Sequence, residues 1–385
     1  MRILIATNRF HPAIGGVETY TYLVGTRLAG QGHAVSVYCS DYAETSSNRK
    51  LNAFATNENG IVVSRLRSFR IFSIDALTII PALPFRMFLK PDFDAVFVNG
   101  YGYFVSYCAI VAAKLGGKPV LFTPHYSEET THPAFVKKIF DLSFGRVSFG
   151  LADKIICLTR TEKKKVSATF RVPLDKITIL PNGIEVEKYF HPALGKKAVK
   201  KYRLGTGKKI LFVGRLAKNK GLEYLLRAFP TVLLEYPDAR LLIVGEDNGQ
   251  LAFLNRLARE LRIDKNTKFL GKLMDDDFYG IFNCADVFAL PSFAGEAFGI
   301  VLLEAMASGL PVVASNVGGV RCLIKKQNGA VIPPKDSRVL AAALISALAA
   351  GKERYGEANI AESRKYDADK IAGKIMAEME RLVRL

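Results

Sequence analysis

The chain has 385 residues, of which 49% are hydrophobic, and this length and composition predict a globular protein with two buried cores. Its 54 basic and 36 acidic residues give a net charge of +18, so anionic partners are expected. Five cysteines without a C-x-x-C pair are typical of free thiols in a reducing compartment, and no apolar run is long enough for a signal peptide or a membrane span, which predicts a cytoplasmic protein.

The first predicted strand, residues 1–6, leads into a glycine-containing loop, residues 12–18. Gly15 and Gly16 stand before a predicted helix, where adjacent glycines let the backbone approach a ligand; a plain tight turn explains them nearly as well. Glu18 falls in the first turn of that helix, where its charge is favourable. The G-x-G-x-x-G fingerprint is absent, which counts against a hydride-transfer enzyme.

Further strands are predicted at 34–38, 94–98, 120–126 and 154–158, alternating with helical segments. This alternation predicts an α/β protein with parallel sheets covered by helices. The strand at 120–126 ends near His125, although a lone histidine in such a place is more often an ordinary hydrogen-bonding residue.

Two basic stretches lie in this half, at 65–72 and 137–171. One interpretation is a solvated basic face over core phenylalanines. The other is a surface that rests on an anionic membrane. No recognition helix, zinc spacing or RNA-binding aromatic motif indicates nucleic acid. The aromatic residues among and near these basic residues are Phe69, Phe72, Phe85, Phe88 and Phe144.

The second half opens with Pro181-Asn182-Gly183, a turn signal, and then a predicted strand at 209–214. Arg215 and Lys220 follow that strand directly. Ligands of open α/β sheets bind at the carboxyl ends of the strands, and a planar guanidinium beside a mobile ammonium suits a diphosphate. A basic loop by itself is usually only solvated.

The most informative segment follows a predicted strand at 285–290 and carries two carboxylates eight residues apart, Glu296 and Glu304. Gly299 opens a helix between them, and the amides of Gly299, Ile300 and Val301 at its start attract an anion. Glu296 in the loop can then reach one end of a bound molecule and Glu304 the other. The alternative is an amphipathic helix with a solvated glutamate.

Asp275-Asp276-Asp277 resembles a D-x-D motif of the kind that binds a divalent cation. It stands between a predicted strand and a predicted helix, so we interpret it as an acidic helix start. No metal site is predicted.

The patterns G-R-L-x-x-x-K-G at 214–221 and E-x7-E at 296–304 together resemble the donor half of the retaining nucleotide-sugar glycosyltransferases of family 4. The resemblance implies the GT-B fold, in which two Rossmann-like, doubly wound parallel-sheet domains face each other across a cleft that holds the active site. It implies an acceptor-side domain at 1–182 completed by a last helix at 366–385, and a donor-binding domain at 183–365. That last helix keeps one apolar face.

The resemblance also implies site residues. The catalytic set would be His125, Glu296, Arg215 and Lys220. Arg215, Lys220 and the amides after Gly299 would neutralise the leaving diphosphate in place of a metal. Glu304 would hold the ribose hydroxyls, and Glu296 and His125 the transferred sugar. The other donor-binding residues would be Gly15, Gly16, Lys272, Leu273, Phe298, Gly299, Ile300 and Val301.

The sequence thus predicts a retaining, metal-independent hexosyltransferase that takes a UDP- or GDP-sugar and needs no cofactor. The acceptor would be a glycan or a lipid carrier, with peripheral contact to the inner face of a membrane. The alternatives are a nucleotide-sugar 2-epimerase, a glycogen-synthase-like polymerase, and a non-catalytic protein that binds a sugar nucleotide or polysaccharide.

Overall fold

The computed structural model describes residues 1–13, 15–43, 49–52, 55–71, 75–89, 92–126, 138 and 140–384. The chain forms two compact units: unit 1 comprises Met1–Gly183 and Ala368–Leu385, and unit 2 comprises Ile184–Asp367. The domain boundaries predicted from the sequence lie after residues 182 and 365. Phe72 and Lys137, at ends of the two basic stretches, lie outside the described residues, as does Ile14 of the glycine-containing loop.

Unit 1 is built on an eight-stranded sheet in the order β10-β9-β8-β7-β1-β2-β4-β3, parallel except for the edge strand β3. The strand order reverses between β1 and β7, where the loops after these two strands leave opposite faces of the sheet. The strands are β1 (Arg2–Thr7), β2 (Ala34–Ser40), β3 (Ala55–Glu58), β4 (Ile61–Leu66), β7 (Ala95–Asn99), β8 (Val120–Thr123), β9 (Lys154–Cys157) and β10 (Ile177–Ile179), with β5 (Phe69–Arg70) and β6 (Thr78–Ile79) pairing separately.

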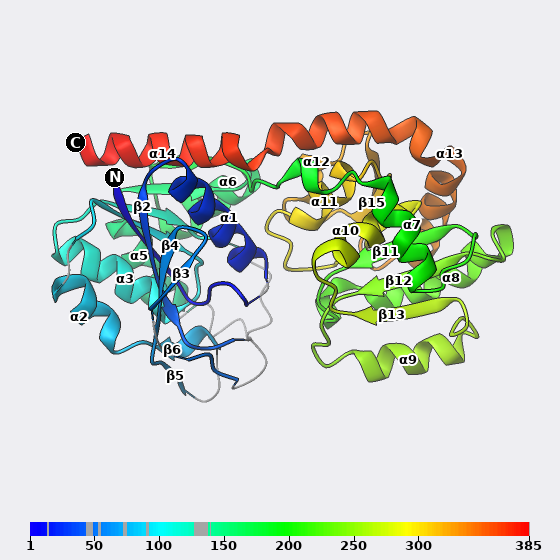
Figure 1. Cartoon of the computed structure of the whole chain (residues 1–385), viewed down its shortest axis with the longest axis horizontal. Helices are drawn as coiled ribbons and strands as arrows, with labels where there is room; N and C mark the ends of the chain where they lie inside the picture. The colour runs from blue at the N-terminus through cyan, green and yellow to red at the C-terminus, as the bar shows by residue number, and fades with distance from the viewer. Residues whose placement is uncertain are drawn as a thin grey trace. The chain divides into compact units, whose positions relative to one another are not determined.

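Both faces of this sheet are buried, because alternate side chains of each strand enter two different cores. Leu4, Val96 and Phe122 belong to one core, and Ile5 and Phe97 to the other. Figure 1 shows α14 running beside α1, and Ile371, Ile375 and Met379 of α14 complete the second core. The helices are α1 (Gly16–Gly30), α2 (Ala82–Leu89), α3 (Phe104–Leu115), α5 (Arg146–Leu151), α6 (Arg160–Phe170) and α14 (Ala368–Arg384), with short turns η2 (Asp75–Leu77), η3 (Asp141–Gly145) and η4 (Leu174–Lys176).

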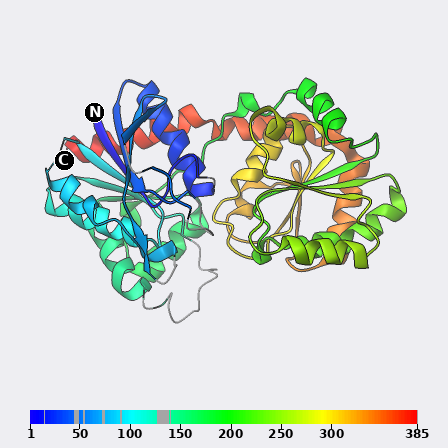
Figure 2. The same cartoon turned by 60° about the horizontal axis from the view of Figure 1, so that its bottom comes forward.

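Unit 2 has a six-stranded, fully parallel sheet in the order β13-β12-β11-β14-β15-β16. This is the strand order of a doubly wound dinucleotide-binding fold, and it reverses between β11 and β14. Figure 2 shows the strands nearly end-on with helices on both sides of the sheet. The strands are β11 (Lys209–Val213), β12 (Arg240–Val244), β13 (Thr267–Gly271), β14 (Val287–Leu290), β15 (Val312–Ser315) and β16 (Gly329–Ile332).

In unit 2, α7 packs against α10, and α13 packs against both α8 and α11. Helix α10 begins at Asp275, so the three aspartates stand in its first turn as expected. The helices are α7 (Pro192–Lys201), α8 (Leu222–Glu235), α9 (Leu251–Glu260), α10 (Asp275–Cys284), α11 (Ile300–Ala307), α12 (Val320–Leu323) and α13 (Ser337–Ser363), with turns η5 (Val186–Lys188), η6 (Lys218–Lys220) and η7 (Arg364–Tyr366).

The two sheets, one fully parallel and one parallel except at its edge strand β3, are covered by helices and confirm the predicted α/β class. In the described part of the chain, no helix combines the length and the apolar character needed to cross a bilayer.

Candidate functional site

The predicted donor-site residues of unit 2 lie at one edge of its sheet. All six strands are parallel, so the segments that follow them meet at their carboxyl ends. Arg215 and Lys220 follow β11, Lys272 follows β13, and Glu296 follows β14. The loops after β11 and β14 flank the point where the strand order reverses, the usual ligand position in such a sheet.

The loops after β11 and β14 are bonded to each other. The Phe293 amide donates to the Asn219 carbonyl at 2.9 Å, and the Asn219 side chain donates to the Ala294 carbonyl at 3.1 Å. Gly221, in a left-handed conformation at φ 69°, packs so closely that a Cβ there would overlap the Pro291 carbonyl oxygen. These contacts fix the position of the β11 loop relative to Glu296.

Lys220 and Glu296 form an ion pair between the two loops. Lys220 Nζ lies 2.5 Å from Glu296 Oε1, and the two side chains are only 15% and 8% exposed. The buried Ser292 hydroxyl donates to the same carboxylate oxygen at 2.7 Å. The sequence assigned Lys220 and Glu296 to different parts of a ligand, and the structure shows that they also bind each other.

The backbone of Glu296 is held by a third loop, which follows β15. The Gly319 amide donates to the Glu296 carbonyl at 3.0 Å. The adjacent Gly318 is left-handed at φ 50°, and a Cβ there would overlap that carbonyl oxygen. A residue other than glycine at position 318 would therefore displace Glu296.

Gly299 caps the N-terminus of α11 in the left-handed conformation at φ 88°, where glycine is favoured. The first amides of α11 have no intrahelical acceptors and, with the helix dipole, form an anion-binding end directly after Glu296. Phe298 is buried and contacts the Tyr366 ring at a centroid distance of 5.9 Å. Phe298 is therefore packed within unit 2 and anchors the loop.

Glu304 lies in α11 and is buried. Tyr189 Oη donates to Glu304 Oε1 at 2.8 Å. Burial raises the pKa of Glu304 to about 7, and the tyrosine hydrogen bond opposes this by stabilising the carboxylate. Near neutral pH, Glu304 is thus balanced between its two protonation states, and a ligand whose hydroxyls donate to the carboxylate would shift it to the ionised form.

Arg215 and Lys272 are exposed, and Leu273 is partly buried. Within the described part of the chain, the Arg215 guanidinium has no hydrogen-bond or ion-pair partner. Arg215 is therefore an exposed cation after β11 that is open to an anion. No cluster of three or more His, Cys, Asp or Glu side chains suited to a metal ion occurs among the described residues.

His125 belongs to unit 1, directly after β8, and adopts a left-handed backbone conformation at φ 51°. Its Nε2 is buried and has no hydrogen-bond partner among the described residues. The Tyr20 ring packs edge-on against the imidazole at 4.9 Å, and burial lowers the pKa of His125 to about 3. The imidazole is thus neutral near pH 7, with a ring nitrogen left for a hydroxyl partner.

A buried carboxylate that the sequence did not single out fixes the backbone next to His125. Glu162 accepts the Tyr126 amide and the Leu158 amide, both at 2.6 Å. Burial raises the pKa of Glu162 to about 7. The sequence signal was Thr159-x-x-Glu162, a capping-box pattern at the start of α6.

The glycine-containing loop of unit 1 is held by ion pairs. Arg9, only 6% exposed, binds Glu18 at 2.8 Å and also pairs with Asp75. A Cβ on Gly15 would clash with the Glu18 carboxylate, so within unit 1 this glycine makes room for Glu18. Gly16 is the first residue of α1.

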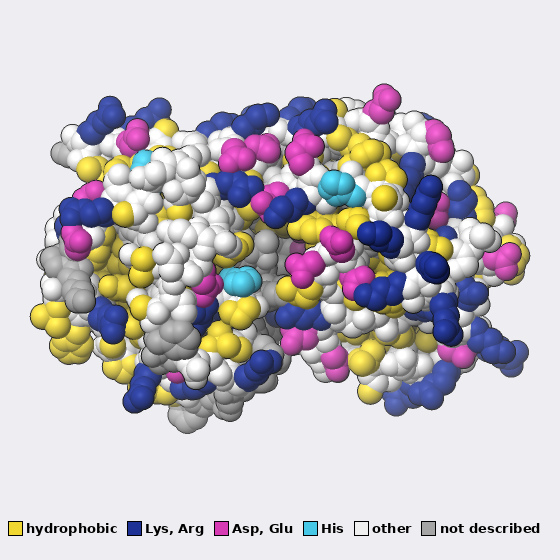
Figure 3. All heavy atoms as spheres, in the orientation of Figure 1, with side chains coloured by type: hydrophobic (Ala, Val, Ile, Leu, Met, Phe, Trp, Pro, Cys, Tyr) yellow, Lys and Arg dark blue, Asp and Glu magenta, His cyan; other side chains and the backbone are white. Residues whose placement is uncertain are grey.

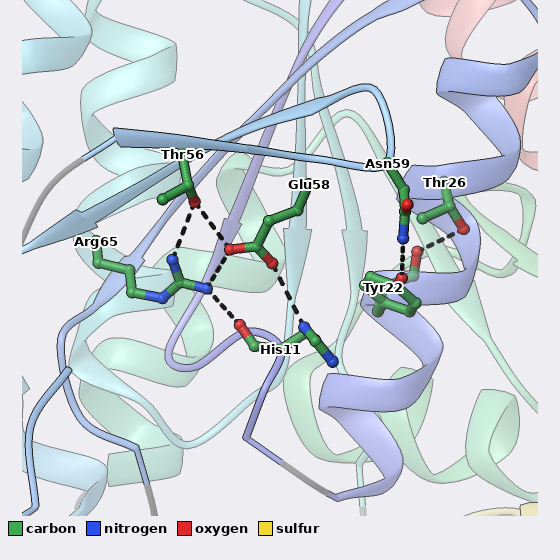
Figure 4. A network of polar contacts seen from close by, with 7 residues as sticks. All are labelled: His11, Tyr22, Thr26, Thr56, Glu58, Asn59 and Arg65. Atoms are coloured by element: carbon green, nitrogen blue, oxygen red, sulfur yellow. Dashed lines mark hydrogen bonds and ion pairs between the residues drawn. The ribbon is translucent and has the colours of Figure 1, made fainter. Parts of the chain in front are cut away.

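A second network supports the same loop (Figure 4). Arg65 on β4 donates to the His11 carbonyl at 2.5 Å and to Glu58 at 2.6 Å, and Glu58 also contacts the His11 ring at 3.4 Å. Arg70 is likewise buried, with its side chain 3% exposed, and pairs with Asp75. The prediction that the arginines of 65–72 form a basic surface is therefore wrong for Arg65 and Arg70, because both neutralise carboxylates inside the unit.

Two family models match the chain, one for each half. The model for Glycosyltransferase Family 4 matches residues 14–188, and the model for Glycosyl transferases group 1 matches residues 196–362.

Among curated relatives, the chain is 28% identical to the glycogen synthase of Mycobacterium tuberculosis over 369 residues, covering 90% of this chain and 86% of that protein. It is 37% identical to the phosphatidyl-myo-inositol mannosyltransferase of the same organism over 215 residues, 52% of this chain and 53% of that protein.

Among solved structures, the Anabaena protein Alr3699/HepE in complex with UDP and glucose superposes with a TM-score of 0.81 at 19% identity, over 99% of this chain and 100% of that one. That likeness shows the fold, and the family models for the two halves show the family. The chain belongs to the family 4-like glycosyltransferases with the GT-B fold.

Proposed function

We propose that the protein is a retaining glycosyltransferase that moves a hexose from a nucleoside diphosphate sugar, with UDP-glucose as the first donor to test, to an acceptor hydroxyl. The observation that carries the proposal is the Lys220–Glu296 ion pair at the strand-order reversal of unit 2, next to the N-terminus of α11. A cation and an anion-binding helix end at this position support the binding of a diphosphate. Structural relatives solved with UDP and UDP-glucose favour this donor class.

Cleavage of the bond between sugar and diphosphate places negative charge on the leaving oxygens. Lys220, Arg215 and the first amides of α11 would stabilise that charge, so we propose that the reaction needs no metal. Glu296 would accept hydroxyls of the sugar once a phosphate competes with it for Lys220. Glu304 would accept the ribose hydroxyls.

On the side of unit 1, we propose that the neutral His125 imidazole bonds a hydroxyl of the transferred sugar, since its Nε2 is buried without a partner in the described chain. We further propose that the leaving phosphate receives the acceptor proton on the same face of the sugar. We assign no covalent step to Glu296. In retaining glycosidases one of two paired carboxylates is the nucleophile, whereas Glu296 is ion-paired with Lys220.

The donor assignment is tested with UDP-, GDP- and ADP-sugars, measuring thermal stabilisation and slow donor hydrolysis in the parent, Lys220→Ala and Glu304→Ala. We expect one sugar nucleotide to stabilise the parent and both variants to lose that effect. Stabilisation by no sugar nucleotide would reject the donor site.

Further readouts separate the alternatives. Formation of an epimeric sugar nucleotide without an acceptor would identify the protein as a 2-epimerase and not a transferase. Repeated transfer onto a glucan primer would identify a polymerase. Tight donor binding without hydrolysis or transfer across an acceptor screen would instead favour a non-catalytic binding protein.

We also propose that unit 1 touches an anionic membrane through α2. Phe85, Phe88 and Leu89 on this helix are 69%, 48% and 80% exposed, and Arg86 lies exposed among them. Figure 3 shows hydrophobic side chains gathered over the position of α2. An exposed apolar strip with a cation fits the boundary between lipid headgroups and acyl chains. Phe144, by contrast, packs against Phe104 and Tyr107 within unit 1.

Co-sedimentation with phosphatidylglycerol vesicles tests this contact. The parent should bind them better than phosphatidylcholine vesicles, and Phe85→Ser with Leu89→Ser should lose most of the binding. Leu234→Ser on α8 is the matched control, because Leu234 is 81% exposed in unit 2. Equal binding by the α2 variant and the parent would contradict the proposal.

A further inference from the structure

A cavity of about 530 Å³ lies in unit 1, away from the residues assigned to the donor. Its volume is in the range of small-molecule sites. Asp41 follows β2, and Arg67 and Ser68 follow β4, so the cavity opens at the carboxyl ends of these two strands. Lys50 and Phe69 also line the cavity.

The position of the cavity relates it to the glycine-containing loop. In the sheet order β7-β1-β2-β4, strands β2 and β4 are the next neighbours of β1 and run parallel to it. The cavity therefore opens at the same sheet edge as the loop after β1, one to two strand spacings away, or about 5–10 Å. That distance is comparable to one sugar ring.

Most charges around the cavity are neutralised internally. Asp41 accepts the Ser68 amide at 3.2 Å and lies 3.5 Å from Lys50 Nζ. Lys50 also donates to the Ser68 carbonyl and lies over the Tyr42 ring at 4.8 Å. Lys50 and Asp41 are thus committed to each other and to the wall.

Arg67 is different. Its side chain is exposed, and no residue in the described ranges pairs with its guanidinium. The neighbouring Arg65 and Arg70 are buried in ion pairs, so Arg67 supplies the uncompensated charge of this wall. Phe69, 50% exposed, places an apolar ring beside it. A planar guanidinium beside an aromatic surface suits a ligand with an oxyanion and an apolar ring face.

We propose that this cavity binds the acceptor and that the acceptor is a sugar or polyol carrying a phosphate, held by Arg67 and resting against Phe69. This inference rests on the proposed transferase function and names its acceptor class. The phosphate belongs either to a soluble sugar phosphate or to a lipid headgroup.

The chain contains no tryptophan, so Phe69→Trp introduces a single indole fluorophore into the cavity wall. In a phosphate-free buffer, its emission is titrated with glucose 6-phosphate and with glucose. A second arm uses phosphatidylinositol vesicles and, as an equally anionic lipid without a polyol headgroup, phosphatidylserine vesicles. The titrations are repeated with Arg67→Gln added, and with Arg146→Gln added as the matched control, since Arg146 is an exposed arginine on α5 of the same unit.

We expect a saturable change with glucose 6-phosphate or with phosphatidylinositol vesicles, at least tenfold weaker with glucose or phosphatidylserine. Arg67→Gln should abolish it, and Arg146→Gln should preserve it. A response in the soluble arm identifies a free sugar phosphate, and a response in the vesicle arm alone identifies a headgroup. No saturable response in either arm, or an equal response after Arg67→Gln, overturns the proposal. Retained stabilisation by UDP-glucose shows that only the acceptor inference, not the donor site, has failed.

Discussion

We predict that binding of the donor is coupled to ionisation of Glu304. With a pKa of about 7, the carboxyl is about one tenth ionised at pH 6 and about nine tenths ionised at pH 8. If the ribose hydroxyls bind the ionised form, the affinity for UDP-glucose should rise about tenfold between these pH values, and about half a proton should be released per binding event at pH 7. The Glu304→Gln variant should show neither effect.

Isothermal titration in buffers of different ionisation enthalpy measures the released protons. UDP-glucose is the suitable ligand because its phosphodiester groups do not titrate between pH 6 and 8. Glu162 also has a pKa of about 7, so the comparison with Glu304→Gln assigns the proton to the correct carboxyl. Proton uptake in place of release, or the same pH profile in Glu304→Gln, would refute the assignment of Glu304 to the ribose.

The pKa of Glu304 also affects stability. Its native pKa lies above the ordinary value of 4.5, so the native state binds more protons than the unfolded chain between pH 4.5 and 7. Ionisation of Glu304 should therefore lower the free energy of unfolding as the pH rises through this range, by about 3 kcal/mol in total. Glu304→Gln should relieve most of that loss, which urea unfolding at pH 5 and pH 8 would measure.

Three further predictions concern the same sheet edge. Tyr189→Phe removes the hydrogen bond that favours ionised Glu304, so the midpoint of the pH profile for UDP-glucose binding should move above that of the parent; an unchanged midpoint would exclude this coupling. Gly318→Ala should lower both stability and turnover, because its Cβ would displace the Glu296 carbonyl. Gly249 is also left-handed but has open space around it, so Gly249→Ala should lower the free energy of unfolding by only about 1 kcal/mol. Similar losses of stability in both variants would argue against a specific contact at Gly318. Lys220→Ala should reduce turnover about a hundredfold. In the protein without ligand, the losses of thermal stability caused by Lys220→Ala and Glu296→Ala should be less than additive, since the two side chains pair there; additive losses in a double-mutant cycle would contradict the pairing.

The fold could be predicted from the sequence because local patterns determine it. Apolar runs such as 209–214 and 240–244 alternate with helical segments, and such alternation forms parallel sheets in nearly any context. Residues 214–221 and 296–304 were also identifiable, because glycine, cations and carboxylates stand at fixed offsets from strand ends.

The contacts that connect these segments could not be predicted, because they join residues far apart in the chain. Nothing near Tyr189 indicates that it binds Glu304, which is 115 positions away. The Gly318 contact with the Glu296 carbonyl depends on a left-handed turn whose partner lies in another loop. The burial of Arg65 and Arg70 follows from carboxylates on other elements, and the charge count of the stretch gave the opposite expectation.

Hydrogen–deuterium exchange with and without UDP-glucose tests the location of the donor site most directly. We predict slower exchange in the segments after β11 and β14, residues 214–221 and 292–301, and loss of that protection in Lys220→Ala. Binding of UDP-glucose without protection of these segments, or with protection confined to the cavity wall at 50–52 and 67–69, would contradict this location of the donor site.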